Sequence, residues 1–79
     1  MNLSRREVNA MEEIRDCIGH LACCGDAYTG YVTSLYRGHR TSTYLAVGET
    51  FTVERKDSIT EVTRATDTSF EVRSRHTAA

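Results

Sequence analysis

Residues 4–25 carry the most regular pattern in the sequence, and it is typical of an amphipathic helix. Ser4 and Glu7 have the spacing of an S-x-x-E capping box, which pairs free backbone amides at a helix start. Gly25 is a natural helix stop. Apolar residues between them recur at steps of three or four: Val8, Met11, Ile14, Ile18 and Leu21. The spacing therefore predicts one helix over about residues 4–24. Its solvated face would carry Glu12, Glu13 and Asp16.

Gly19 lies inside this segment, where glycine costs about 1 kcal/mol relative to alanine in a helix. We therefore expect Gly19 to let another backbone come close to the helix.

From Tyr28 onward the composition becomes that of β-strands, because threonine is abundant, aromatic residues appear and good helix formers become rarer. Turn signals divide this half into expected strands at 31–36, 41–47, 50–55, 59–64 and 69–73. The connections are short, so neighbouring strands should pair antiparallel in a single meander. The apolar residues expected on its inner face are Leu45, Val47, Phe51, Val53, Phe70 and Val72.

Two parts of this half are less regular. Ile59 and Val62 lie three residues apart, so we expect a bulge or a bend in the fourth of these strands. Residues 74–79 have no apolar anchor and are expected to fray.

These elements together predict an α+β fold, with one N-terminal amphipathic helix packed on a four- to five-stranded antiparallel meander sheet over about residues 28–73. A chain of 79 residues has room for a single domain, 1–79. It buries only about 60% of its extended surface, which favours a dimer or a tight partner. The sequence contains no proline, so its edge strands are protected by charge alone, and edge pairing is a route to a homodimer.

The composition also limits which binding partners and which cellular compartment we expect. No segment is long and apolar enough to span a bilayer, and the N-terminus lacks the apolar region of a secretion signal. Three cysteines, two of them adjacent, do not form a disulfide framework, so we expect a cytoplasmic protein. The formal net charge of −1 gives no general attraction for nucleic acid or for an acidic membrane.

The candidate chemistry is weak. Cys17, His20 and Cys24 would share one side of a helix, but this spacing differs from the usual zinc knuckles. We expect the thiols to fill the core and to hold no metal, with a thiol or zinc sensor as an alternative. The chain shows no nucleophile motif and no glycine-rich phosphate loop, so we expect neither an enzyme nor a cofactor.

A second alternative is a single-stranded nucleic-acid-binding protein. Tyrosines and arginines alternate in the β half, the combination that stacks bases and holds phosphates. The excess of basic over acidic residues after residue 26 is too small for a surface that binds a phosphate backbone. Direct binding to nucleic acid is therefore the less favoured hypothesis.

The remaining class is a small non-enzymatic protein-binding module that occludes or clamps a larger protein or nucleoprotein complex. Its most concrete form is a phage or mobile-element inhibitor of a bacterial defence complex, similar in size and architecture to anti-CRISPR proteins. The tip at residues 37–40 is the expected clamp, because Arg and Tyr are the residue types that anchor interfaces. The predicted contact residues are Tyr36, Arg37, His39, Arg40, Tyr44, Glu12, Glu13 and Asp16.

Overall fold

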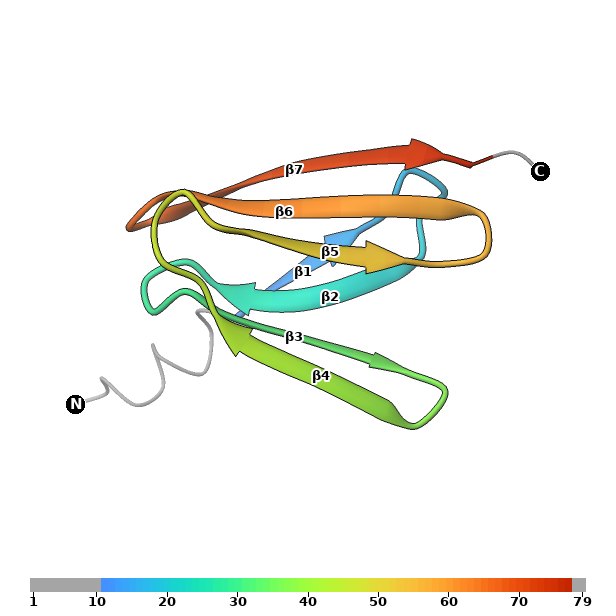
Figure 1. Ribbon diagram of the computed structural model, residues 1–79, viewed down its shortest axis with the longest axis horizontal. Coiled ribbons are helices and arrows are strands. Elements are labelled where there is room, and N and C mark those ends of the chain that lie inside the picture. The colour runs from blue at the N-terminus through green and yellow to red at the C-terminus, as the bar shows by residue number, and fades with distance from the viewer. Residues whose placement is uncertain (1–10, 78–79) are drawn as a thin grey trace.

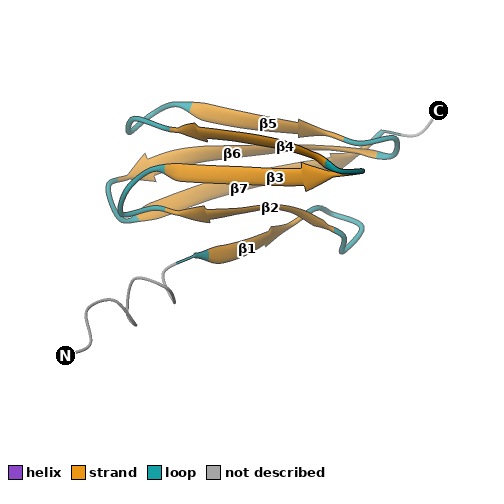
Figure 2. Cartoon of the chain, turned by 90° about the horizontal axis from the view of Figure 1, so that it is seen from below, coloured by secondary structure: helices purple, strands orange, loops and turns teal. Residues whose placement is uncertain are grey.

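The computed structural model describes residues 11–77, which form seven β-strands and no helix (Figures 1 and 2). The strands are β1 (Glu12–Arg15), β2 (Leu21–Asp26), β3 (Tyr31–Tyr36), β4 (His39–Tyr44), β5 (Thr50–Glu54), β6 (Ser58–Thr66) and β7 (Ser69–His76). They form two antiparallel sheets, with the orders β1-β2-β3-β4 and β5-β6-β7. The described part of the chain contains no helix that could cross a lipid bilayer.

The hydrophobic core lies between the two sheets. Ile14, Ala22 and Cys23 come from the first sheet, and Val53 and Val62 come from the second. Phe51 and Phe70 are half-buried and pack against this cluster. The described residues therefore form a small β-sandwich, in which each sheet buries one face against the other.

The α+β prediction is wrong, because the predicted helix is replaced by β1, a turn and β2 from Glu12 onward. The turn is set by Asp16, whose Oδ1 accepts hydrogen bonds from the backbone amides of Ile18 at 3.0 Å and His20 at 2.9 Å. An aspartate that pairs nearby amides in this way competes with the helix for the same backbone groups. Residues 4–10, which include the predicted capping box, lie outside the described residues.

Two glycines have roles opposite to those predicted. Gly19, expected to permit close packing, lies in the β1–β2 turn at φ +97°, a conformation that favours glycine, and its Cα faces open space. Gly25, expected to end the helix, lies inside β2, where an added Cβ would stand 2.8 Å from Cε2 of Phe70. Gly25, and not Gly19, therefore permits a close approach, to the aromatic ring of Phe70 on β7.

The strands of the β half are largely as predicted, but the single meander is wrong. The chain crosses from one sheet to the other after β4. The amide of Leu45 still donates to Gly30 in the first sheet at 2.7 Å, whereas the amide of Gly48 donates to Arg64 in the second sheet at 2.7 Å. The segment predicted as a hairpin turn at Gly48 is thus the connection between the two layers.

The predicted inner face is correct in part. Leu45 and Val53 are buried and Phe51 and Phe70 are half-buried, but Val47 and Val72 are exposed.

The irregularity of β6 also differs from the prediction. Its register shift lies between Arg64 and Thr66, so no bulge is needed between Ile59 and Val62. Residues 74–76, expected to fray, pair with β6, and β7 ends at His76.

Candidate binding surface

The β3–β4 hairpin, residues 31–44, is the most distinctive part of the described surface. It lies within residues 27–48, a stretch that contains all four tyrosines of the chain and no aspartate or glutamate. The strands pair without a break from Tyr31–Tyr44 to Tyr36–His39. The turn between them, Arg37-Gly38, has φ values of 52° and 83°, as a tight two-residue hairpin turn requires.

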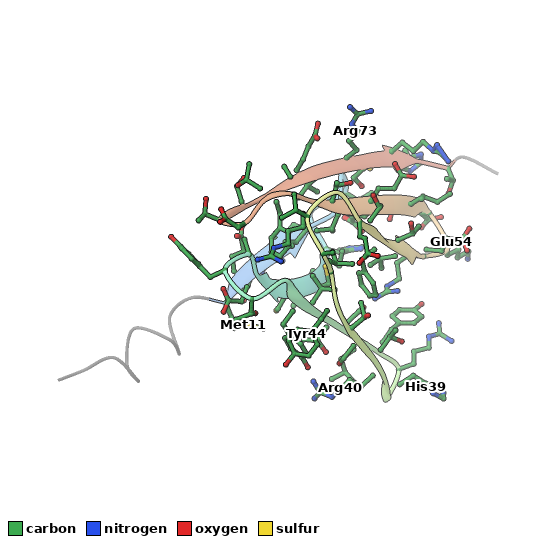
Figure 3. The ribbon with its side chains drawn as sticks, turned by 60° about the vertical axis from the view of Figure 1, so that its left-hand side comes forward. Met11, His39, Arg40, Tyr44, Glu54 and Arg73 are labelled. Carbon is green, nitrogen blue, oxygen red and sulfur yellow. The ribbon has the colours of Figure 1, made fainter. Side chains whose placement is uncertain are left out.

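Strand β4 is exposed along its whole length, since all six of its residues are accessible to solvent. In Figure 1 the turn end of the hairpin extends away from β5, β6 and β7, whereas Val32 and Ser34 of β3 are buried. Figure 3 shows His39 and Arg40 toward this turn end, Tyr44 nearer the body of the molecule, and Arg73 on the opposite side.

The outer face of the hairpin carries an ordered aromatic and polar surface. Tyr31 and Tyr44 are paired across the strands with ring centroids 5.1 Å apart, and Tyr44 is 69% exposed. The Tyr31 hydroxyl donates to Ser42 Oγ at 3.2 Å, and Thr33 Oγ1 shares a 2.8 Å hydrogen bond with the same atom. Arg40 Nη1 donates to Thr33 Oγ1 at 3.5 Å. These contacts hold the rings and the guanidinium group on one face.

A shallow hollow of about 290 Å³ adjoins this surface on the outer face of the first sheet. Leu21, Leu35, Cys24 and Arg40 are among the residues that line it. Leu21 and Leu35 are both well exposed, so the outer face also presents apolar area.

The opposite face of the hairpin is fixed at Tyr36. The guanidinium carbon of Arg55 lies 4.1 Å from the centre of the Tyr36 ring, and that of Arg37 lies 5.3 Å from it. Arg55 also donates through Nη2 to Ser34 Oγ at 3.0 Å and to the Ala22 carbonyl at 3.4 Å. This half-buried arginine therefore ties the end of β5 to β2 and β3.

Of the five predicted contact residues on the hairpin, four lie at or next to its turn, whereas Tyr44 lies at the other end of the strand pair, opposite Tyr31. The five residues also lie on two faces. Because paired residues of antiparallel strands point to the same side, Arg40 and Tyr44 lie on the outer face with Tyr31. Tyr36 and His39 lie on the other face, in register with each other.

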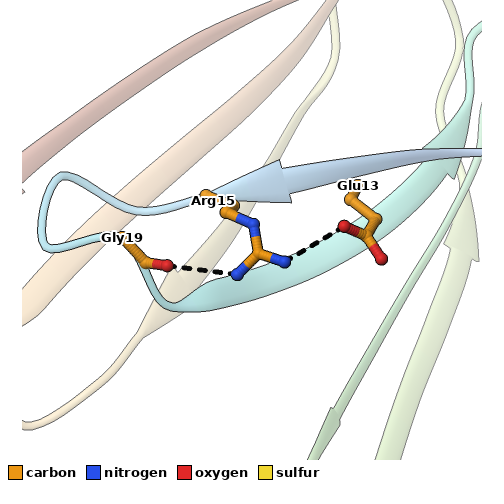
Figure 4. A network of polar contacts seen from close by, with 3 residues as sticks. All are labelled: Glu13, Arg15 and Gly19. Atoms are coloured by element: carbon orange, nitrogen blue, oxygen red, sulfur yellow. Dashed lines mark hydrogen bonds and ion pairs between the residues drawn. The ribbon is translucent and has the colours of Figure 1, made fainter.

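The three predicted acidic residues do not form a solvated helix face. Glu12 and Glu13 lie on β1, which β2 and β3 separate from β4. Glu13 forms an exposed ion pair with Arg15 at 3.1 Å, and Arg15 also donates to the Gly19 carbonyl (Figure 4).

Asp16 is buried at 7% exposure and has a structural role. In addition to the two turn amides, it accepts a hydrogen bond from the Ser58 hydroxyl at 3.0 Å, which links the β1–β2 turn to β6. Burial acts to raise the pKa of Asp16, but the hydrogen bonds from His20, Ser58 and Ile18 outweigh it and hold that pKa below its ordinary value.

The cysteines occupy three different environments. Cys17 is exposed in the β1–β2 turn, Cys24 is half-buried on β2, and Cys23 lies in the core. Burial, together with neighbouring Cys24, raises the pKa of Cys23 to about 11. Within residues 11–77, no group of three or more His, Cys, Asp or Glu side chains is arranged to hold a metal ion.

Two arginines, Arg55 and Arg64, connect the layers, a role that the sequence did not predict for them. Arg64 donates to three backbone carbonyls of the opposite layer: Ala27 at 2.9 Å, Leu45 at 3.0 Å and Tyr28 at 3.0 Å. The sequence contains a pattern that could have indicated this role. Arg64 follows Thr60 and Val62 at alternate positions of β6, and these positions point inward.

No protein-family model, curated protein or solved structure matches this chain.

Proposed function

We propose that this chain is a non-enzymatic binding module that engages a larger protein through the β3–β4 hairpin. The observation that carries the proposal is the full exposure of β4 within a stretch that has four tyrosines and no acidic residue. Tyrosine and arginine are the residue types most enriched at interface anchors, because they offer large contact area and several hydrogen-bond donors.

The hairpin is also organised before binding. The Tyr31–Tyr44 ring pair and the hydrogen bonds at Ser42 fix the outer face, and the stacked Arg55 fixes Tyr36 on the other. A surface whose side chains are already ordered loses less conformational freedom on binding.

The charge of the hairpin indicates a partner with carboxylates or other anionic groups at the contact. The ion pairs among residues 11–77 are Arg15–Glu13 and Arg73–Glu71. Neither involves Arg37 or Arg40, so these two cations are available to a partner. Complementary charge would speed the encounter and set its orientation.

The narrower prediction, an anti-CRISPR-like inhibitor of a bacterial defence complex, fits this chemistry only through clamping by the hairpin tip. Occlusion by an acidic helix face is ruled out, because Glu12 and Glu13 lie on strand β1 and Asp16 is buried. The identity of such a partner stays a prediction.

A matched pair of variants tests the proposal. The hairpin variant combines Arg37→Glu, Arg40→Glu and Tyr44→Ala, and the control combines Arg73→Glu and Arg75→Glu on the distant β7. Each purified chain is used as bait in a lysate of the source organism, and captured proteins are quantified by mass spectrometry. We expect a stoichiometric protein with the wild type and the control that is lost with the hairpin variant. Equal capture by all three baits, or no stoichiometric protein, would contradict the proposal.

A single-stranded nucleic acid is the second candidate, favoured by one observation. The exposed ring of Tyr44 and the half-buried ring of Tyr31 lie on the same face as Arg40, as in surfaces that stack bases and hold phosphates. The net charge of −1 argues for the protein partner instead. A labelled single-stranded oligonucleotide at low salt separates the two, since binding that is lost on Tyr44→Ala, and kept on Arg73→Glu, would favour nucleic acid.

A further inference from the structure

Strand β4 has an unpaired edge that is unusually well suited to strand addition. It is the last strand of its sheet, and its pairing with β3 shows no register shift. Its sequence, HRTSTY, contains no proline and no lysine, and Arg40 is its only permanent charge. Edges of this kind, without blocking residues or bulges, readily pair with another strand.

The other edges of the sandwich are less suited to this. Strand β1 has four residues and an irregular register, and β7 carries Glu71, Arg73 and Arg75 at alternate positions beside an irregular register of its own. Strand β5 has only five residues, and its last residue, Glu54, is followed directly by the charged Arg55 and Lys56.

The direction of the free backbone groups on β4 follows from one hydrogen bond. The amide of Leu45 donates to Gly30, so position 45 faces β3. Since successive residues of a strand alternate, positions 43, 41 and 39 also face β3. The amides and carbonyls of Arg40, Ser42 and Tyr44 therefore point outward from the edge.

We propose that two copies of this chain pair through β4, antiparallel, with Ser42 opposite Ser42 of the second copy. In this register Arg40 of one copy stands opposite Tyr44 of the other, and each of these outward-facing pairs exchanges two backbone hydrogen bonds. The two-fold axis runs perpendicular to the sheet, so the two four-stranded sheets become one continuous sheet. The second, three-stranded sheets of both copies lie on the same side of it.

The side chains support this register. Arg40 and Tyr44 form a cation and aromatic pair across the new interface, on the face that already carries Tyr31. The two Arg40 residues are displaced by four positions along the strands, which at about 3.4 Å per residue places them about 14 Å apart. This distance exceeds the Debye length of about 8 Å at physiological salt, so their repulsion is largely screened. The only charge on the edge is thus placed against an aromatic ring.

The inference is independent of the proposed function. Pairing occupies the backbone edge of β4 and leaves the outer face exposed, so a dimer could form whether or not a larger partner binds there.

The first experiment measures the mass of the full chain by sedimentation equilibrium from micromolar to millimolar concentration. We expect a concentration-dependent rise from 8.9 kDa to twice that mass. A chain that stays monomeric at millimolar concentration would overturn the proposal.

Proline substitution then identifies the edge. Ser42→Pro removes an outward amide of β4 and leaves the amides that pair with β3 in place. Thr52→Pro is the matched control, because the amide of Arg55 donates to Ser58 and the alternation therefore places the Thr52 amide on the free edge of β5. We expect Ser42→Pro to abolish the dimer and Thr52→Pro to keep it, and the opposite pattern would refute pairing through β4.

Circular dichroism verifies that both variants fold. If Ser42→Pro does not fold, Ser42→Lys replaces it, because this substitution sets two cations opposite each other in the dimer.

A cross-link tests the register. In a Cys17→Ser and Cys24→Ser background, Ser42→Cys places two thiols on opposite residues with Cα atoms about 5.5 Å apart, within the range of a disulfide. We expect rapid formation of a covalent dimer on oxidation. Thr43→Cys in the same background is the control, because position 43 stands opposite position 41 of the other copy. Cross-linking at 43 in preference to 42 would show that the register is wrong.

Discussion

Replacing Arg64 with methionine should remove the strongest polar connection between the two sheets while keeping the aliphatic part of the side chain. The guanidinium group of this β6 residue donates to the carbonyls of Ala27, Tyr28 and Leu45. Ala27 and Tyr28 lie in the β2–β3 turn, and Leu45 begins the crossing between sheets. Arg64 thus fixes the base of the β3–β4 hairpin against the second sheet.

The size of the effect follows from the burial of these hydrogen bonds. The bonds to Ala27 and Leu45 are part-buried, and the bond to Tyr28 is exposed. A hydrogen bond from a charged donor contributes about 1.5 kcal/mol at the low end of its range, so the two part-buried bonds together contribute about 3 kcal/mol. A domain of this size has a free energy of unfolding of roughly 4–12 kcal/mol, so the loss is a large part of the total.

Thermal unfolding followed by circular dichroism measures this loss. At about 4–8 °C per kcal/mol for a small domain, Arg64→Met should lower the melting temperature by about 12–24 °C. The melting temperature of Arg64→Lys should lie between those of Arg64→Met and the wild type, because one ammonium group cannot reach all three carbonyls. Arg73→Met, at an exposed ion pair on β7, is the control and should change stability by less than about 0.5 kcal/mol. If Arg64→Met and Arg73→Met have the same melting temperature, the assigned role of Arg64 is wrong.

Three further predictions concern backbone conformation, acid stability and thiol reactivity. Gly30→Ala should cost at least about 2 kcal/mol in unfolding experiments, since its Cβ would overlap a backbone carbonyl, whereas Gly38→Ala, at a similar φ but in open space, should cost about 1 kcal/mol. Because the folded-state pKa of Asp16 is below its ordinary 3.8, its stabilising effect is complete above that value and is lost as the pH falls through the folded-state pKa. Denaturant midpoints below about pH 4 should therefore depend less on pH in Asp16→Asn than in the wild type. Iodoacetamide should modify exposed Cys17 rapidly and Cys23 only on unfolding, as mass spectrometry of the peptides would show, and equal rates would contradict the burial of Cys23.

The β half of the fold could be predicted because its signals are local. Threonine-rich segments alternate with turn residues, and the range 31–36 of the third strand is confirmed to the residue. The separation into two sheets could not be predicted in this way, because Gly48-Glu49 has the composition of a hairpin turn. Leu45 bonds Gly30 and Gly48 bonds Arg64, and both partners are distant in sequence, so only the tertiary structure shows that they belong to different layers.

The N-terminal half was misread because a spacing of three and four residues fits a helix, while the competing signal is a single short turn. The sequence Asp16-Cys17-Ile18-Gly19 places an amide-accepting side chain three residues before a glycine, which is typical of a turn. Ile14 and Cys23 are apolar for the reason predicted, to fill a core, but they do so from paired strands.

For the candidate site, the hairpin tip was predictable because its residues are neighbours in sequence. The acidic residues were predicted as contact residues because a helix would have placed them on one face. Glu12 and Glu13 lie on strand β1 instead, and adjacent residues of a strand point to opposite sides, so they do not share a face. The role of Arg55 depends on its meeting Tyr36 across the two layers, which no local pattern contains.

The residues that hold the fold together and the residues proposed to bind a partner lie in different parts of this chain, and this separation makes the hairpin testable. The core residues and the two connecting arginines hold the sandwich together, whereas every residue of β4 is exposed. Substituting Arg40 should therefore change the free energy of unfolding by only about 0.5 kcal/mol. Substituting Tyr44, which also loses its ring pair with Tyr31, should cost about 1 kcal/mol. Variants at these positions that lose a partner or a dimer while melting like the wild type will have lost a contact surface, because the fold that presents it is held by Arg55 and Arg64 from outside the hairpin.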